Sequence, residues 1–371
     1  MNVELYSGAG FFLVAAALCV PAIALGIMER SIKHYGIVAS VIMLLLVMKD
    51  SWVSILILCS YMCYQVLLIK SLLYLKHRER TDAKINRIFV ALAIMPLIAS
   101  KLISYFDIGT LGFIGLSYMT FKSVQVLIEI GDGLIKEVRI TDYLYFTLFF
   151  PTVLCGPIDR SRRFLADSEI QISKTEYLEL LGDGLYRISI GAVYKFVFAN
   201  LCMLAGIDNM YVYGFYMFFD FAGYSMMAIG LGQVFGIQTP ENFRNPWKSI
   251  DMRDFWNRWH ITLSTWLRDF LFSRILKNSM RAKLFGGDRV YQACFCLMIN
   301  MFVMGLWHGL EANYIVYGLY HGVLLAVTEL YQKKSKFYKK YRNNRIYRFL
   351  SWFATFNLVM VGFGIFSGDI F

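Results

Sequence analysis

Long apolar segments separated by short polar connections make up most of the chain. Residues 37–48, 51–69 and 88–99 are examples of such segments. Runs of this kind are typical of helices that cross a bilayer, whereas the strands of transmembrane barrels alternate apolar and polar positions. The pattern therefore predicts an all-α, polytopic membrane protein with about eleven transmembrane helices. No linker-like stretch divides the sequence, which predicts one integral domain over residues 1–371.

Residues 239–289 depart from this pattern. They include the segment DFWNRWHITLSTWLRDF (254–270), in which three tryptophans, arginines and His260 are mixed with apolar residues. Tryptophan and arginine on an apolar background are typical of the interface between lipid headgroups and hydrocarbon. Because the region has no uninterrupted apolar run long enough to span, we expect amphipathic or re-entrant helices at the cytoplasmic face.

The distribution of charge predicts the orientation of the chain. There are 37 basic and 26 acidic residues, a net charge of +11, and the first ten residues contain no lysine or arginine. Basic residues gather instead at 76–87 and 332–348, so the positive-inside rule places both termini on the extracytoplasmic side. The same rule explains the excess of basic residues. A more specific explanation is that the cytoplasmic surface binds an anionic partner, either lipid or an acidic protein. Nothing resembles a soluble nucleic-acid-binding module, which argues against nucleic acid as a partner.

Two of the five histidines are candidates for chemistry. His308 ends an apolar run, between Trp307 and Gly309. An ionisable residue at membrane depth is costly and indicates a functional site, and imidazole suits general-base work near neutral pH. A purely structural role for His308, as a packed and hydrogen-bonded side chain, is an equally good interpretation. His260 is either functional or incidental to an interfacial anchor, and for His321 a packed structural role is favoured.

The sequence lacks the common motifs for metal binding, thiol chemistry, serine hydrolysis and phosphate binding. The sequence contains no HxxxH, HExxH or CxxC, no G-x-S-x-G and no phosphate-binding loop, so we expect no metal and no bound cofactor. What remains is a membrane-embedded site that contains histidine. This alone does not separate a transferase from a transporter or a scaffold. The lack of repeat halves with paired broken helices favours an enzyme modestly.

Two segments carry a resemblance to a known family. NPWKSIDMRDFWNRWHITLSTWLRDFLF (245–272) and MGLWHGLEANYIVYGLYHG (304–322) resemble the membrane-bound O-acyltransferase (MBOAT) family. FFPTVLCGPIDRSRRF (149–164) and YMFFDFAGYSMMAIGLGQVFGIQTPENF (216–243) resemble its D-alanyl transfer branch, the DltB type of Gram-positive bacteria. The resemblance implies a ring of helices around a central funnel, with His308 and His260 as catalytic residues.

The resemblance also implies a reaction. The donor would be D-alanine, held as a thioester on the phosphopantetheine arm of a small acidic carrier protein of the DltC type. The acceptor would be lipoteichoic acid, reached with a DltD-type membrane protein. His308 would take the proton of the acceptor hydroxyl, and His260 would orient the thioester carbonyl or relay a proton. An O-acetyltransferase acting on an exported polysaccharide such as alginate or cellulose is the alternative.

Two short motifs, WNRWH (256–260) and LWHG (306–309), are called the histidine boxes below. Contacts with substrate or carrier are expected from residues in and near these boxes. An acidic carrier would be steered toward the basic, tryptophan-rich residues 247–283. The candidates are Trp307, Arg253, Arg258, Trp259 and Asn257. For the arginines, membrane lipid headgroups are an equal alternative partner.

Overall fold

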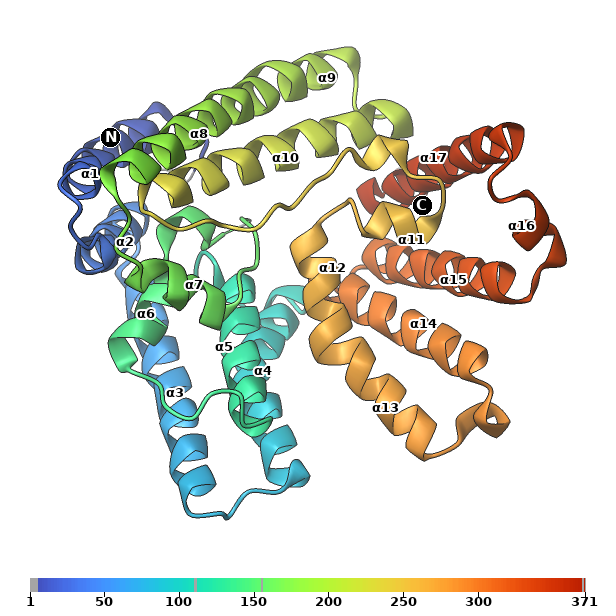
Figure 1. The fold of residues 1–371 in the computed structure, drawn as a ribbon, viewed down its shortest axis with the longest axis horizontal. Helices are drawn as coiled ribbons and strands as arrows, with labels where there is room; N and C mark the ends of the chain where they lie inside the picture. The colour runs from blue at the N-terminus through green and yellow to red at the C-terminus, as the bar shows by residue number, and fades with distance from the viewer. Residues whose placement is uncertain (1–5, 110–111, 155, 369, 371) are drawn as a thin grey trace. The chain divides into compact units, whose positions relative to one another are not determined.

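All regular elements in the described part of the chain are helical (Figure 1). The computed structural model describes residues 6–109, 112–154, 156–368 and 370. The α-helices are α1 (Ala9–Ile27), α2 (Lys33–Val47), α3 (Trp52–His77), α4 (Ala83–Tyr105), α5 (Leu116–Gly131), α6 (Ile140–Leu148), α7 (Ser161–Glu169), α8 (Lys174–Val193), α9 (Ala199–Ala205), α10 (Met210–Val234), α11 (Met252–Trp256), α12 (Ile261–Leu267), α13 (Ser273–Arg281), α14 (Arg289–His308), α15 (Ala312–Lys334), α16 (Lys336–Tyr341) and α17 (Arg345–Ser367). The all-α prediction is confirmed.

Six helical stretches in the described ranges are long and apolar enough to cross a membrane. They cover Ala9–Ile27, Trp52–His77, Ala83–Tyr105, Lys174–Ala205, Arg289–His308 and Arg345–Ser367. These stretches confirm a multi-pass membrane protein. The larger number of eleven spans stays a prediction.

The contacts within the chain fall into two units. Unit 1 comprises Met1–Val193 and Gly223–Pro240, and unit 2 comprises Tyr194–Ala222 and Glu241–Phe371. Helix α10 contributes its first half to unit 2 and its second half to unit 1. Both histidine boxes lie in unit 2. The prediction of one integral domain stays a prediction.

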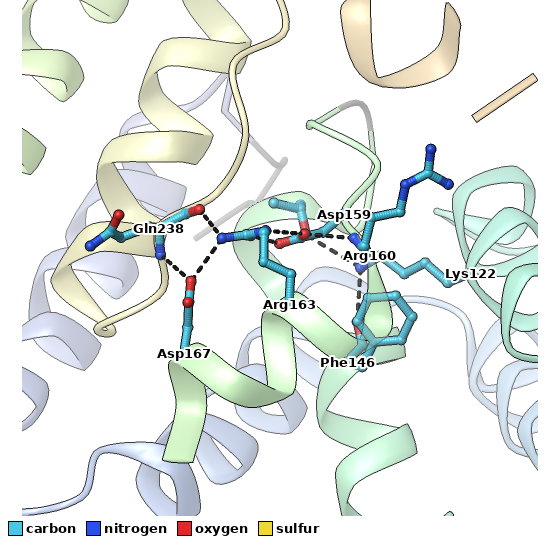
Figure 2. A network of polar contacts seen from close by, with 8 residues as sticks. Lys122, Phe146, Asp159, Arg160, Arg163, Asp167 and Gln238 are labelled. Carbon is cyan, nitrogen blue, oxygen red and sulfur yellow. Dashed lines mark hydrogen bonds and ion pairs between the residues drawn. The ribbon is translucent and has the colours of Figure 1, made fainter. Parts of the chain in front are cut away.

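A buried polar network holds unit 1 together (Figure 2). Lys122 of α5 is 1% exposed and donates to the carbonyl oxygen of Phe146 over 2.9 Å. Asp159, also 1% exposed, pairs with Arg163 of α7, which in turn donates to the carbonyl oxygen of Gln238. Buried charges are tolerated when they are paired and hydrogen-bonded. The network therefore gives Asp159 and Arg163, both in the segment GPIDRSRRF (156–164), a structural explanation.

Helices α14 and α15 approach closely in unit 2, and α17 packs against α15 (Figure 1). Gly305 of α14 lies opposite Gly318 of α15. A Cβ atom at Gly318 would lie 2.6 Å from the carbonyl oxygen of Met301, so only glycine fits without a shift of backbone. Small residues permit such close packing of membrane helices. The seam positions His308, the last residue of α14, beside α15.

Residues 241–287 form short helices, and no helix in this range meets the length and apolarity of a span. Helix α12, a π-helical turn (Arg268–Phe272) and α13 follow one another without a break over residues 261–281. Arg274, Lys277 and Arg281 of α13 are exposed, as in an amphipathic helix. The short helices agree with the expected non-spanning region, and its place at the cytoplasmic face stays a prediction.

Candidate functional site

His260 stands immediately before α12 in an unusual backbone conformation. Its φ and ψ angles are 44° and 53°, in the left-handed region, and its exposure is 3%. Such a conformation is uncommon for a residue with a side chain and costs on the order of 1 kcal/mol. It persists where the surroundings over-determine it, and residues of this kind cluster at functional sites.

The surroundings of His260 keep its imidazole neutral. Its Nδ1 atom lies 3.1 Å from Oδ1 of Asn242, and the edge of the ring meets Phe221 at a centroid distance of 4.8 Å. Burial, followed by the nearby His308, lowers the pKa of His260 from 6.5 to about 3. The charged form is disfavoured because an imidazolium here would lose its hydration without gaining a counter-ion.

His308 lies in a cluster of aromatic rings. Its ring centroid is 4.5 Å from Trp307 and 5.0 Å from Phe366 of α17. Tyr314 and Tyr317 of α15 follow at 6.1 and 6.2 Å. Aromatic rings within about 6 Å attract a cation, and the C-terminal end of a helix favours positive charge. The cluster therefore suits a histidine that becomes positively charged when it takes a proton.

Trp307 connects the two histidines. Its ring centroid is 6.3 Å from that of His260 and 4.5 Å from that of His308. The structure thus brings together three of the residues expected from the sequence, although His260 and His308 are 48 positions apart in the chain. A base, an uncharged imidazole and an apolar wall in one place can support acyl transfer to a hydroxyl.

Trp259 faces a separate cavity in unit 2. The side chain is 5% exposed and lines a space of about 310 Å³. Trp247, Phe218 and Phe363 are among the other lining residues, nearly all of which are apolar. Trp259 is therefore a buried wall of this cavity, and its contact with substrate or carrier stays a prediction.

The two arginines expected to contact a carrier pair with carboxylates of the chain itself. Arg253 forms an ion pair with Glu329 of α15. Arg258 donates from Nε to Oδ1 of Asp254 over 2.7 Å. Asn257 is exposed at the C-terminal end of α11. A carrier contact by these residues stays a prediction.

His321 is packed in the core of unit 2, as favoured for a structural histidine. It is 1% exposed, and its ring lies 4.6 Å from Tyr317 and 5.2 Å from Trp256. Within the described ranges, no three His, Cys, Asp or Glu side chains gather as a metal site would require.

Several residues around the histidines were not anticipated from the sequence. Tyr314 and Tyr317 could have been found, because positions three apart on the helix after the LWHG box share a face. Asn242 and Phe221 lie 18 and 39 positions before His260 and carry no periodic signal that links them to it. Phe366 comes from the last helix, and only tertiary packing brings it to His308.

Comparison with known proteins identifies the family of this chain. The profile of the membrane-bound O-acyltransferase family matches residues 196–368. The teichoic acid D-alanyltransferase of Bacillus subtilis (strain 168) is 38% identical, and the alignment covers 99% of this chain and 98% of that protein. The teichoic acid D-alanyltransferase of Streptococcus thermophilus is 36% identical, with 99% and 95% covered. The probable alginate O-acetylase AlgI of Pseudomonas syringae pv. tomato is 33% identical over 69% of this chain and 49% of its own length. The chain therefore belongs to the membrane-bound O-acyltransferase family.

Proposed function

We propose that this protein is an acyltransferase that moves D-alanine from a carrier-protein thioester to teichoic acid. The observation that carries the proposal is the alignment, over 99% of the chain, with a relative named teichoic acid D-alanyltransferase. The paired histidines of unit 2 support it, since they offer the base that such a transfer needs. Alginate O-acetylase relatives cover a smaller part of the chain, so acetyl transfer to an exported polysaccharide is the second candidate.

The reaction is an exchange of an S-acyl bond for an O-acyl bond. The oxygen of an acceptor hydroxyl attacks the thioester carbonyl carbon, a C–O bond forms, and the C–S bond breaks. The proton of the hydroxyl passes to the imidazole of His308 and then to the departing thiolate. Because the thioester is already activated, the protein has to supply only proton transfer and stabilisation of the oxyanion. The aromatic cluster around His308 supports this role by favouring the transient imidazolium.

The donor in this proposal is the phosphopantetheine arm of a DltC-type carrier on the cytoplasmic side. The acceptor is lipoteichoic acid outside, reached with a DltD-type partner, and both termini of the chain lie outside. Exposed basic side chains at Arg274, Lys277 and Arg281 of α13 give an acidic carrier a surface that attracts it electrostatically. Arg253 and Arg258 each form an ion pair with a carboxylate of the chain.

The test supplies carrier loaded with labelled D-alanine to membranes that contain wild type, His308→Ala or His34→Ala. His34 is an exposed histidine and serves as the matched control for expression and handling. We expect His34→Ala to transfer label into teichoic acid as wild type does, and His308→Ala to lose transfer. Full transfer by normally expressed His308→Ala would remove His308 from the reaction. In a parallel assay with a labelled acetyl donor, transfer of acetyl groups but not of D-alanyl groups would replace the main proposal with the second candidate.

A further inference from the structure

Three polar groups meet at the side-chain oxygen of Asn242. Its Oδ1 atom accepts from the hydroxyl of Thr262 over 2.9 Å and from the backbone N–H of Thr262 over 3.3 Å. Nδ1 of His260 lies 3.1 Å from the same oxygen. Asn242 is fully buried, and its own carbonyl oxygen accepts from the backbone N–H of Ile261. The first turn of α12 is therefore tied to Asn242 on both its backbone and its side chain.

The backbone N–H of Thr262 fixes which way the amide of Asn242 points. A backbone N–H is always a donor, so the group opposite it must be the amide oxygen and not the NH₂. The nitrogen of His260 that faces this oxygen must then carry a proton. In a neutral imidazole one nitrogen donates and the other accepts. His260 is consequently in the Nδ1–H tautomer, with the lone pair on Nε2.

The Nε2 atom of His260 is buried and ready to accept. None of the described residues forms a hydrogen bond with it, although buried polar atoms are ordinarily satisfied. The rings of Phe221 and Trp307 pack around the imidazole and offer it no counter-charge. The lone pair thus stays in the aromatic surroundings shared with His308.

We propose that Asn242 is a positioning residue that locks His260 in the Nδ1–H tautomer, so that His260 meets the substrate as a hydrogen-bond acceptor through Nε2. This inference rests on the proposed function, because it assigns a role within the same acyl-transfer site. A neutral imidazole with its lone pair on Nε2 has no proton there to donate to a thioester carbonyl. His260 instead accepts from an N–H or O–H of the substrate, and the oxyanion is stabilised by other donors.

The tautomer can be read directly by NMR. The full chain, labelled with ¹⁵N-histidine and reconstituted in lipid, contains only five histidines, and a His260→Asn variant identifies the signals of His260. We expect a protonated Nδ1 and an unprotonated Nε2 at neutral pH. A protonated Nε2 on His260 would overturn the inference. The NMR measurement does not depend on transfer activity. The inference about the tautomer can therefore be refuted independently of the proposed function, which the His308→Ala experiment tests.

Variants of the partner separate positioning from general packing. Asn242→Asp keeps an acceptor opposite Nδ1 and should preserve the tautomer, whereas Asn242→Leu removes the acceptor and should give mixed tautomers. Thr262→Val removes one donor to the same oxygen without touching His260, and should leave both the tautomer and transfer near wild type. We expect Asn242→Leu to reduce transfer about 10- to 100-fold, with partial recovery in Asn242→Asp. Equal loss in Thr262→Val and Asn242→Leu, with an unchanged tautomer in both, would show that Asn242 acts only in packing.

Discussion

The glycine seam between α14 and α15 makes a prediction for Gly318→Ala. The added methyl group would lie 2.6 Å from the carbonyl oxygen of Met301 and 3.0 Å from the Cα atom of Gly305. Both are backbone atoms, so no side-chain rotation relieves the clash and the two helices must separate. Because Tyr314 and Tyr317 on α15 contact His308, separation also disturbs the candidate site.

Two opposing contributions determine how much Gly318→Ala changes the free energy of unfolding. Overpacking a close contact costs about 1–3 kcal/mol, and a clash with backbone belongs near the upper end. Replacing glycine by alanine within a helix returns about 1 kcal/mol. The net expectation is a loss of about 2 kcal/mol in the free energy of unfolding, and with it reduced transfer.

The assay is thermal unfolding of the purified protein in detergent, together with transfer of labelled D-alanine. Gly182→Ala is the matched control, since Gly182 is an exposed glycine in α8 with nothing within 4 Å of an added Cβ. We expect Gly182→Ala to raise Tm slightly and Gly318→Ala to lower it by a few degrees. Equal Tm values for the two variants would refute the argument that the seam requires glycine.

Three other outcomes are expected. Arg253→Ala should lower Tm, because it removes the ion-pair partner of the buried Glu329. The double variant Arg253→Ala/Glu329→Gln should recover most of that loss. A transfer defect that persists in the double variant would point to a carrier contact of Arg253. Since the pKa of His260 falls from 6.5 to about 3 on folding, its contribution to stability is present above pH 6.5 and is lost as pH falls toward 3. Between pH 7.5 and pH 5, Tm should therefore drop further in wild type than in His260→Asn, and an equal drop would contradict this. His260→Gly should be more stable than His260→Ala by about 1 kcal/mol, because glycine adopts the left-handed backbone without strain; thermal unfolding of the two variants checks this.

Local patterns in the sequence were enough to predict an all-helical, multi-pass membrane protein. Continuous apolar runs predict membrane helices because crossing hydrocarbon requires them, and their absence from 239–289 predicts the short helices found there. The same reasoning singled out His308, since an ionisable residue at the end of an apolar run is costly. The closeness of His260 to His308 was expected only through the resemblance to a family.

The remaining features depend on contacts between distant parts of the chain. The left-handed backbone of His260 gives no signal in composition or periodicity, because it follows from the bonds that Asn242 makes with α12. The pairing of Arg253 with Glu329 joins positions 76 residues apart, so the sequence showed an available cation where the structure has an ion pair. The burial of Trp259 likewise depends on residues distant in the chain, among them Phe218 and Phe363.

The ends of two helices give the candidate site a direction. His260 precedes the continuous helical stretch 261–281, and His308 closes α14. A helix carries partial positive charge at its first turn and partial negative charge at its last. In the proposed reaction a proton is therefore repelled from His260 and attracted to His308. In this proposal, the helix ends thus assign substrate binding to His260 and proton transfer to His308.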